Sequence, residues 1–255
     1  VRYRAGTLKA HEVLYFVGTQ QQLHLRQVFA VAAAAGYIGG HQRFRHLPFG
    51  WVLKADNTPF KTRDGADVKL VDVLNEAVDR AHRLVNEKNP DLSLEEKKNI
   101  AKVVGIGAIK YAELSKNRTT DYIFDWDTML SFEGNTAPYL QYAYTRIQSI
   151  FRRENILATE IKGKFHLTDP AELRLAVKLL QFSETINAVI EDYQANILCN
   201  YLFELAGIFM SFYEACPVLK ASEPHRTSRL LLCHLTASTL QKGLDLLGIE
   251  TIEQM

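Results

Sequence analysis

The sequence predicts a mainly α-helical protein, in which a small α/β segment at the N-terminus precedes a helical connector and an all-helical C-terminal domain. Three observations support this fold class. They are one strand–turn–helix pattern near the N-terminus, apolar residues at helical spacing through the middle of the chain, and a dominance of such spacing from residue 135 onward. The 255 residues, 47% of them hydrophobic, are enough for one large core or two smaller ones.

The α/β segment begins with residues 12–17, EVLYFV, an apolar run rich in β-branched and aromatic side chains. Such a run followed by Gly18 predicts a buried strand that ends in a turn. Residues 20–35 predict a helix that ends at Gly36, because glycine is favoured just after a helix C-terminus. A strand, turn and helix in this order form one unit of a parallel sheet, in which ligands bind at the carboxyl ends of strands, here residues 18–24.

The next part of the chain predicts loops and then helices. Residues 39–66 are rich in Gly, Pro, Asn and Asp, and they predict loops with one or two short strands, for example around 51–53. A helix is expected from residue 68 to about residue 87, where the following Pro90 prevents its continuation.

Ser93 and Glu96 have the spacing of a capping box, in which the side chain of each residue bonds the backbone of the other at a helix start. The pattern predicts one helix from there through residue 104 and another over 109–114.

Helices are expected throughout residues 135–255. They begin at Pro138 and at Asp169-Pro170, cover residues 195–214, and finally run from about 222 to Gly248. In the helix after Pro170, four residues are predicted to lie on one face: Leu173, Ala176, Val177 and Leu180.

Charge and cysteine content exclude several classes of protein. The net charge is +1, so any surface that binds nucleic acid must be local. The three cysteines, Cys199, Cys216 and Cys233, are 17 residues apart and form no close pair, which argues against a disulfide framework and a zinc site. The sequence has no uninterrupted apolar stretch of about 18 residues, the length that would predict a membrane span, and a cytoplasmic protein is expected.

Several segments together resemble the arginyl-tRNA synthetase family, and their order and spacing match over essentially the whole chain. They are GTQQQLH at 18–24, HLPFG at 46–50 with FKTRDG at 60–65, KNRTTDYIFDW at 116–126, FEGNTAPYLQYAYTR at 132–146, and the ending GLDLLGIETIEQM at 243–255.

The resemblance implies a class I aminoacyl-tRNA synthetase, which activates arginine with ATP and transfers it to tRNA(Arg). It implies three parts: residues 1–75 from a Rossmann-like catalytic domain, residues 76–134 as a helical connector that contacts the tRNA stem, and residues 135–255 as an α-helical anticodon-binding domain. The expected partners are arginine, ATP with Mg²⁺ and tRNA(Arg), with no bound prosthetic group, no structural metal and no membrane. The full-length enzyme is expected to be a monomer.

The segment at 60–65 resembles this family's version of the class I signature loop. When the arginine carboxylate attacks the α-phosphate of ATP, negative charge builds on the phosphate groups, and cations can stabilise it. Lys61 and Arg63 are the candidate cations, Thr62 is a candidate hydroxyl donor, and Lys54 lies nearby in the sequence. The usual second lysine is absent, so which cation contacts phosphate stays open. Without the resemblance, the segment would be interpreted as a solvated basic turn.

Gln21 and His24 are the substrate-binding candidates of the α/β segment. Gln21 matches a family glutamine that helps to bind arginine, and its amide oxygen is a suitable acceptor for guanidinium N–H groups. His24 matches a histidine beside the nucleotide. By itself, Gln21 would be interpreted as a solvent-facing residue at a helix start and His24 as a structural histidine.

The chain has no match to the His-x-Gly-His motif that holds ATP in class I enzymes, and residues 18–24 supply no carboxylate for the arginine guanidinium. Both are expected upstream of Val1. The sequence therefore predicts a fragment that does not activate arginine by itself.

The candidate tRNA-binding residues are Tyr139, Tyr142, Arg146 and Met255. RNA loops are bound by bases stacked on aromatic side chains and by cations on phosphates. Tyr142 and Arg146 are four residues apart and share a helix face. Basic residues continue at 152–153 and at 162 and 164. The alternative is that the tyrosines pack in the helical core and the basic residues only face solvent.

Two other functions remain open. The chain could be a non-catalytic RNA-binding paralogue, although the retained basic loop at 61–63 argues against that. It could also be a helical protein-interaction domain, which would not bind tRNA at low salt.

Overall fold

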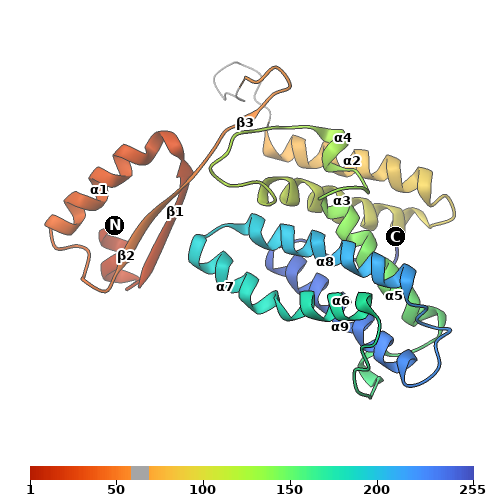
Figure 1. The fold of residues 1–255 in the computed structure, drawn as a ribbon. Helices are drawn as coiled ribbons and strands as arrows, with labels where there is room; N and C mark the ends of the chain where they lie inside the picture. Colours follow the sequence, from red (N-terminus) through yellow and green to blue (C-terminus); the bar gives the residue numbers. More distant parts are fainter. Residues whose placement is uncertain (59–68) are drawn as a thin grey trace. The chain divides into compact units, whose positions relative to one another are not determined.

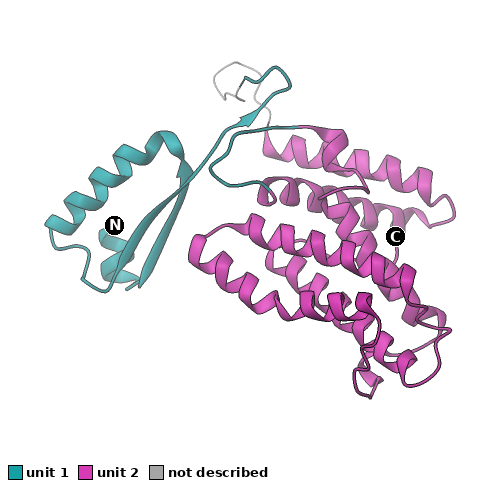
Figure 2. Cartoon of the chain, in the orientation of Figure 1, with its two compact units in different colours: residues 1–61, 116–124 teal, residues 62–115, 125–255 magenta. Residues whose placement is uncertain are grey.

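The computed structural model describes residues 1–58 and 69–255, and the chain folds as two compact units (Figures 1 and 2). Unit 1 comprises residues 1–61 and 116–124, and unit 2 comprises residues 62–115 and 125–255. Lys61, Thr62 and Arg63, the candidate signature-loop residues, lie outside the described ranges.

Unit 1 contains a parallel pair of strands with a helix against it. Strand β1 (Glu12–Gly18) pairs with β2 (Arg43–Phe49) in the register Glu12↔Arg43 to Gly18↔Phe49. A 3-10 turn (Thr19–Gln21) leads from β1 into α1 (Gln22–Ala34). The rings of Tyr15, Phe29 and Phe44 pack together, with centroids 5.2 to 6.3 Å apart, and join α1 to both strands. The predicted strand–turn–helix unit is thus confirmed.

A second parallel pair joins the two sequence segments of unit 1. Strand β3 (Val52–Leu53) pairs with β4 (Tyr122–Ile123). The Asp121 side chain accepts a hydrogen bond from the Trp51 N–H at 2.6 Å. A Cβ at Gly50 would lie 2.8 Å from the Thr120 carbonyl, so only glycine allows the two segments to approach this closely.

Unit 2 consists of helices. They are α2 (Leu70–Lys88), α3 (Leu94–Leu114), α4 (Trp126–Met129), α5 (Ala137–Arg153), α6 (Pro170–Leu180), α7 (Phe182–Asp192), α8 (Ala195–Ala215) and α9 (His225–Leu246), with a 3-10 turn at Ala158–Glu160. The helix starts predicted from capping residues are confirmed, because Ser93 and Glu96 form a reciprocal capping box and Thr136 caps the helix that contains Pro138.

Helices α2 and α3 form a tightly packed hairpin of small residues. Ala77, Ala81 and Ala101 are fully buried, and a Cβ at Gly105 would lie only 2.7 Å from the Ala77 carbonyl oxygen. The prediction of two helices over 93–114 is therefore wrong. The glycine serves close helix–helix packing and does not end the helix.

The larger core lies where α5, α8 and α9 pack together with α6, and its fully buried members include Leu140, Ile147, Leu202, Leu205, Phe209, Leu232 and Leu240. Among the described residues, α8 is the one helix long and apolar enough to cross a membrane by length and composition. Its side chains form the middle of this core, so its apolar character is explained by packing. The three cysteines are free and buried.

The face of α6 that carries the predicted apolar residues is mostly exposed. Leu173, Val177 and Leu180 are exposed, whereas Leu175, Leu179 and the carboxylate residue Glu172 are buried. The physical reason is an ion pair: the Glu172 carboxylate accepts a hydrogen bond from the Arg229 guanidinium at 2.7 Å, and this contact turns the Glu172 face of α6 towards α9.

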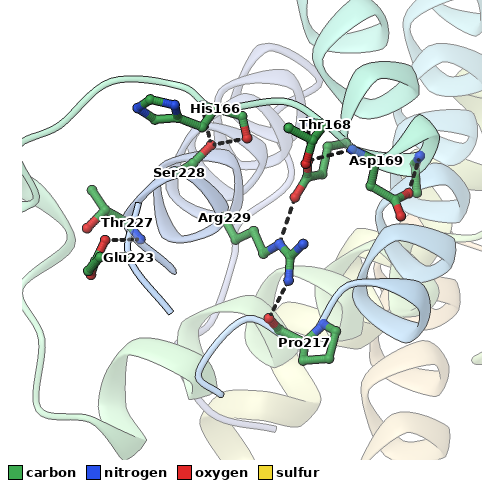
Figure 3. A network of polar contacts seen from close by, with 10 residues as sticks. His166, Thr168, Asp169, Pro217, Glu223, Thr227, Ser228 and Arg229 are labelled. Carbon is green, nitrogen blue, oxygen red and sulfur yellow. Dashed lines mark hydrogen bonds and ion pairs between the residues drawn. The ribbon is translucent and has the colours of Figure 1, made fainter. Parts of the chain in front are cut away.

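Figure 3 shows the polar network around this ion pair. The second carboxylate oxygen of Glu172 accepts the backbone N–H groups of Thr168 and Asp169. Arg229 also donates to the Pro217 carbonyl, and the Ser228 hydroxyl bonds the His166 backbone. Burial alone would raise the pKa of Glu172, but these hydrogen bonds and the Arg229 charge outweigh it and hold the pKa below its usual value. The network fixes the long loop between α5 and α6 to the start of α9.

Candidate nucleic-acid interface

Two adjoining cavities lie along α5 in unit 2, with volumes of about 240 and 510 Å³. They share Asn89, Tyr142 and Met255, and we call them together the α5 cleft. Its remaining lining residues are Val85, Lys88, Leu92, Phe132, Thr145, Arg146, Ser149, Arg152, Arg153, Tyr213 and Gln254.

The α5 side of the cleft follows from helix geometry. Tyr142, Arg146, Ser149 and Arg153 recur at intervals of three and four residues, so they lie along one face of the helix. The opposite face is buried in the core. Tyr142 is 40% exposed, which leaves its ring available to a ligand.

The cleft is a local cationic surface on a chain of nearly neutral net charge. Among the described residues that line it, Lys88, Arg146, Arg152 and Arg153 have positively charged side chains and none has an acidic side chain. Two of the cations lie over aromatic rings: the Arg146 guanidinium is 5.4 Å from the Tyr213 centroid, and the Lys88 ammonium is 5.3 Å from that of Phe132. Such a surface attracts anions and also offers flat apolar faces.

The tail after α9, residues 249–255, forms another wall of the cleft. Two side chains of α5 donate hydrogen bonds to the backbone of the tail. Gln141 donates to the Glu250 carbonyl and Thr145 donates to the Ile252 carbonyl, each at 2.9 Å. Tyr144 donates to the Glu253 carboxylate at 2.9 Å. These contacts hold the tail along α5 and bring Met255 to the cleft.

Close packing of α3 supports the attachment of the tail. Gln141 is fully buried, and a Cβ at Gly107 of α3 would lie 3.0 Å from its amide nitrogen. Two residues of the tail are buried: Ile249 belongs to the larger core, and Ile252 packs against α2 and α3. The tail is thus anchored to both cores of unit 2.

The structure brings together three of the four residues predicted to bind tRNA: Tyr142, Arg146 and Met255 all line the cleft. Tyr139 does not line it. The Tyr139 ring packs edge-on against Phe203, with centroids 5.6 Å apart, and burial raises the pKa of its hydroxyl. Of the basic residues predicted nearby, Arg152 and Arg153 line the cleft, whereas Lys162 and Lys164 lie on the following loop.

Sequence reasoning missed the residues that other elements supply to the cleft. Lys88 is the last residue of α2 and Asn89 follows it in the turn before α3, Phe132 precedes α5, and Tyr213 lies on α8. The Asn89-Pro90 pair indicated only a helix break. Nothing local in the sequence indicated that this turn lies beside α5.

In unit 1, the predicted substrate residues lie where the sequence placed them. Gln21 ends the 3-10 turn after β1, and His24 is in the first turn of α1; both are exposed at the carboxyl end of β1. The Thr19 hydroxyl donates to the Phe49 carbonyl at 3.0 Å and ties this end of β1 to the end of β2. Within the described ranges, no group of three His, Cys, Asp or Glu residues is placed to hold a metal ion.

Two family models match the chain. Residues 1–126 match the catalytic domain of class I tRNA synthetases of the arginine type, and residues 140–255 match the DALR anticodon binding domain. The arginine–tRNA ligases of Erwinia tasmaniensis and Marinomonas are 54% and 52% identical over 255 residues, which are all of this chain and 44% of each relative. The chain therefore spans less than half the length of these relatives.

Solved structures give the same result. The arginyl-tRNA synthetase of Plasmodium falciparum matches with a TM-score of 0.86 and 30% identity, over 100% of this chain and 43% of that one. The enzyme of Thermus thermophilus matches with a TM-score of 0.82 and 33% identity, over 97% of this chain and 42% of that one.

Proposed function

Since this chain belongs to the arginyl-tRNA synthetase family, we propose that it is the tRNA-binding part of an arginine–tRNA ligase and that the α5 cleft receives the anticodon loop of tRNA(Arg). The observation that carries this proposal is the composition of the cleft. Four cations and three exposed or partly exposed aromatic rings line it, and no described lining residue has an acidic side chain. RNA loops are bound by this combination, because splayed bases stack on rings while their phosphates contact cations.

The roles of the cleft residues follow from their positions. The Tyr142 ring offers a stacking face for an unpaired base, and the Met255 side chain provides an apolar contact beside it. Arg146 and Arg153 lie one and three helical turns further along the same face, a spacing that suits successive phosphates of a bent strand. The Asn89 amide has both a donor and an acceptor for a base edge.

For the complete ligase, we propose ATP-dependent activation of arginine followed by transfer to tRNA(Arg). The arginine carboxylate attacks the α-phosphate of ATP, and pyrophosphate leaves. In this proposal, Lys61 and Arg63 stabilise the negative charge on the phosphates of the Mg²⁺-bound ATP, and Thr62 donates a hydrogen bond from its hydroxyl group. The Gln21 side chain accepts a hydrogen bond from the arginine guanidinium. His24 lies beside the nucleotide. A cytoplasmic location, a monomeric enzyme and the three-part division at residues 75 and 134 belong to the same proposal.

The test is a titration of a fluorescently labelled tRNA(Arg) transcript with the 255-residue chain at several salt concentrations. We expect saturable binding that weakens with salt, with a log–log slope of about −2 to −3 for three or four phosphate contacts. A transcript with a scrambled anticodon loop is the control, and it should bind more weakly. No binding at low salt would reject the proposal and favour a protein-interaction domain.

A further inference from the structure

A buried lysine holds the turn that forms one wall of the α5 cleft. Lys97, near the start of α3, is only 8% exposed. Its ammonium donates to the Asn86 side-chain oxygen at 2.9 Å and to the Pro90 carbonyl at 2.7 Å. These two acceptors bracket Lys88 and Asn89, which both line the cleft.

Burial of this ammonium costs free energy of folding, and packing of the α2–α3 hairpin does not by itself require a lysine at this position. Lysine is rarely buried unless it is paired, because its charge loses hydration. Both of these acceptors are neutral, and none of the ion pairs among the described residues involves Lys97. A methionine of similar length would fill the same space without this cost.

The geometry shows what the lysine provides instead. One hydrogen bond fixes the chain before Lys88, and the other fixes it after Asn89, so the chain on both sides of these two residues is attached to α3. Lys88 is the last residue of α2, and the Asn89 N–H closes the final turn of that helix by donating to the Val85 carbonyl at 2.9 Å. Asn89 is one of the three residues that line both cavities of the cleft.

We propose that Lys97 is a positioning residue for RNA binding: it does not touch the RNA, and it holds residues 86–90, the end of α2 and the start of the following loop, so that Lys88 and Asn89 meet the bound loop. This inference rests on the proposed function of the cleft. It adds a determinant in the connector to those on α5 and the tail.

The experiment compares Lys97→Met with Lys98→Met in the 255-residue chain. Both variants lose one positive charge at adjacent positions of α3, but Lys98 is exposed and lines neither cavity of the cleft. We expect Lys97→Met to weaken binding of the tRNA(Arg) transcript about tenfold, the size associated with one lost hydrogen-bonded contact to a charged or polar group. Lys98→Met should weaken it less than twofold. Equal losses would show an effect of charge alone and would overturn the proposal.

A double-mutant cycle with Asn89→Ala separates positioning from general destabilisation. If Lys97 acts through the turn, Lys97→Met should weaken binding much less when Asn89 is already alanine. An undiminished effect of Lys97→Met in the Asn89→Ala background would overturn the proposal. If Lys97→Met does not fold, Asn86→Ala replaces it, because Asn86 is exposed and its side chain is one of the two acceptors.

Tyr142→Ala distinguishes failure of this inference from failure of the proposed function. If Tyr142→Ala weakens binding and Lys97→Met does not, the cleft binds RNA and the role of Lys97 is wrong. If neither variant changes the affinity, the proposed function of the cleft is wrong, and the inference falls with it.

Discussion

At the scale of single residues, the two neighbouring tyrosines of α5 have different surroundings. Tyr142 lines the cleft and is 40% exposed, whereas Tyr139 packs against Phe203. We expect Tyr142→Ala to weaken tRNA binding by about 1–3 kcal/mol, the range for a base stacked on an aromatic ring, with little change in the free energy of unfolding. Titration with labelled tRNA and urea unfolding measure the two quantities.

Tyr139→Ala is the matched control for this prediction. It should lower the free energy of unfolding through lost packing and leave the affinity of the folded chain nearly unchanged. A loss of affinity for Tyr139→Ala that equals the loss for Tyr142→Ala would show that the cleft does not define the binding face.

The buried Glu172–Arg229 pair predicts a pH dependence of stability. The folded-state pKa of Glu172 lies below the ordinary value of 4.5. Its contribution is therefore present above about pH 4.5 and is lost as the pH falls through the folded-state pKa. At neutral pH, Glu172→Gln should lower the free energy of unfolding by about 3 kcal/mol, because it leaves the Arg229 charge without its counter-ion.

Urea unfolding of the wild type and of Glu172→Gln between pH 7 and pH 3 measures this contribution. The difference between the two proteins should shrink as the pH falls below 4.5. A difference that stays constant with pH would contradict the assignment. Asp245→Asn, at an exposed position of α9, should show almost no difference at any pH.

At the scale of elements, the close approach of α2 and α3 depends on a glycine. A methyl group at Gly105 would collide with the backbone at Ala77, and backbone cannot move aside as a flexible side chain can. We expect Gly105→Ala to lower the free energy of unfolding by about 2 kcal/mol or more, despite the better helix propensity of alanine.

Gly207→Ala, within α8, is the control, since no atom lies within 4 Å of a Cβ there. It should raise the free energy of unfolding by up to about 1 kcal/mol. Chemical denaturation of both variants decides the point. Equal effects of the two substitutions would contradict the close packing of the hairpin.

The tail after α9 is a second element with a separable role. Deletion of residues 253–255 removes Met255 and the Glu253 contacts to Tyr144 and Arg152 but keeps the buried Ile252. We expect weaker tRNA binding with helical circular dichroism unchanged. Loss of the helical signal would show instead that the tail is required for folding, and an unchanged affinity would remove Met255 from the binding site.

The elements also show how far sequence reasoning reaches. Helix starts were predictable, because capping residues act locally, as Ser93 and Asp169 do. The buried face of α6 was not predictable, because it contains Glu172. Apolar periodicity predicts a leucine at a buried position, but here a carboxylate is buried together with its hydrogen-bond partners. Helix α7 was missed, since it follows α6 after the single residue Gln181 without a break in the pattern.

At the scale of the whole molecule, a net charge of +1 conceals a cleft with four cations. The resemblance predicted Tyr142, Arg146 and Met255, and the structure brings them together from α5 and the tail. Lys88, Asn89, Phe132 and Tyr213 come from elements far apart in the sequence, so their assembly depends on tertiary packing that no local pattern encodes.

The central claim is that the α5 cleft binds the anticodon loop of tRNA(Arg), and ultraviolet cross-linking followed by mass spectrometry tests it most directly. The complex of the 255-residue chain with the tRNA(Arg) transcript would be irradiated, digested and searched for peptides that carry nucleotides. We predict anticodon-loop nucleotides on peptides that contain Phe132, Tyr142, Tyr213 or Met255. Anticodon-loop nucleotides found only on peptides outside the cleft, such as those of α6 and α7, would contradict the account.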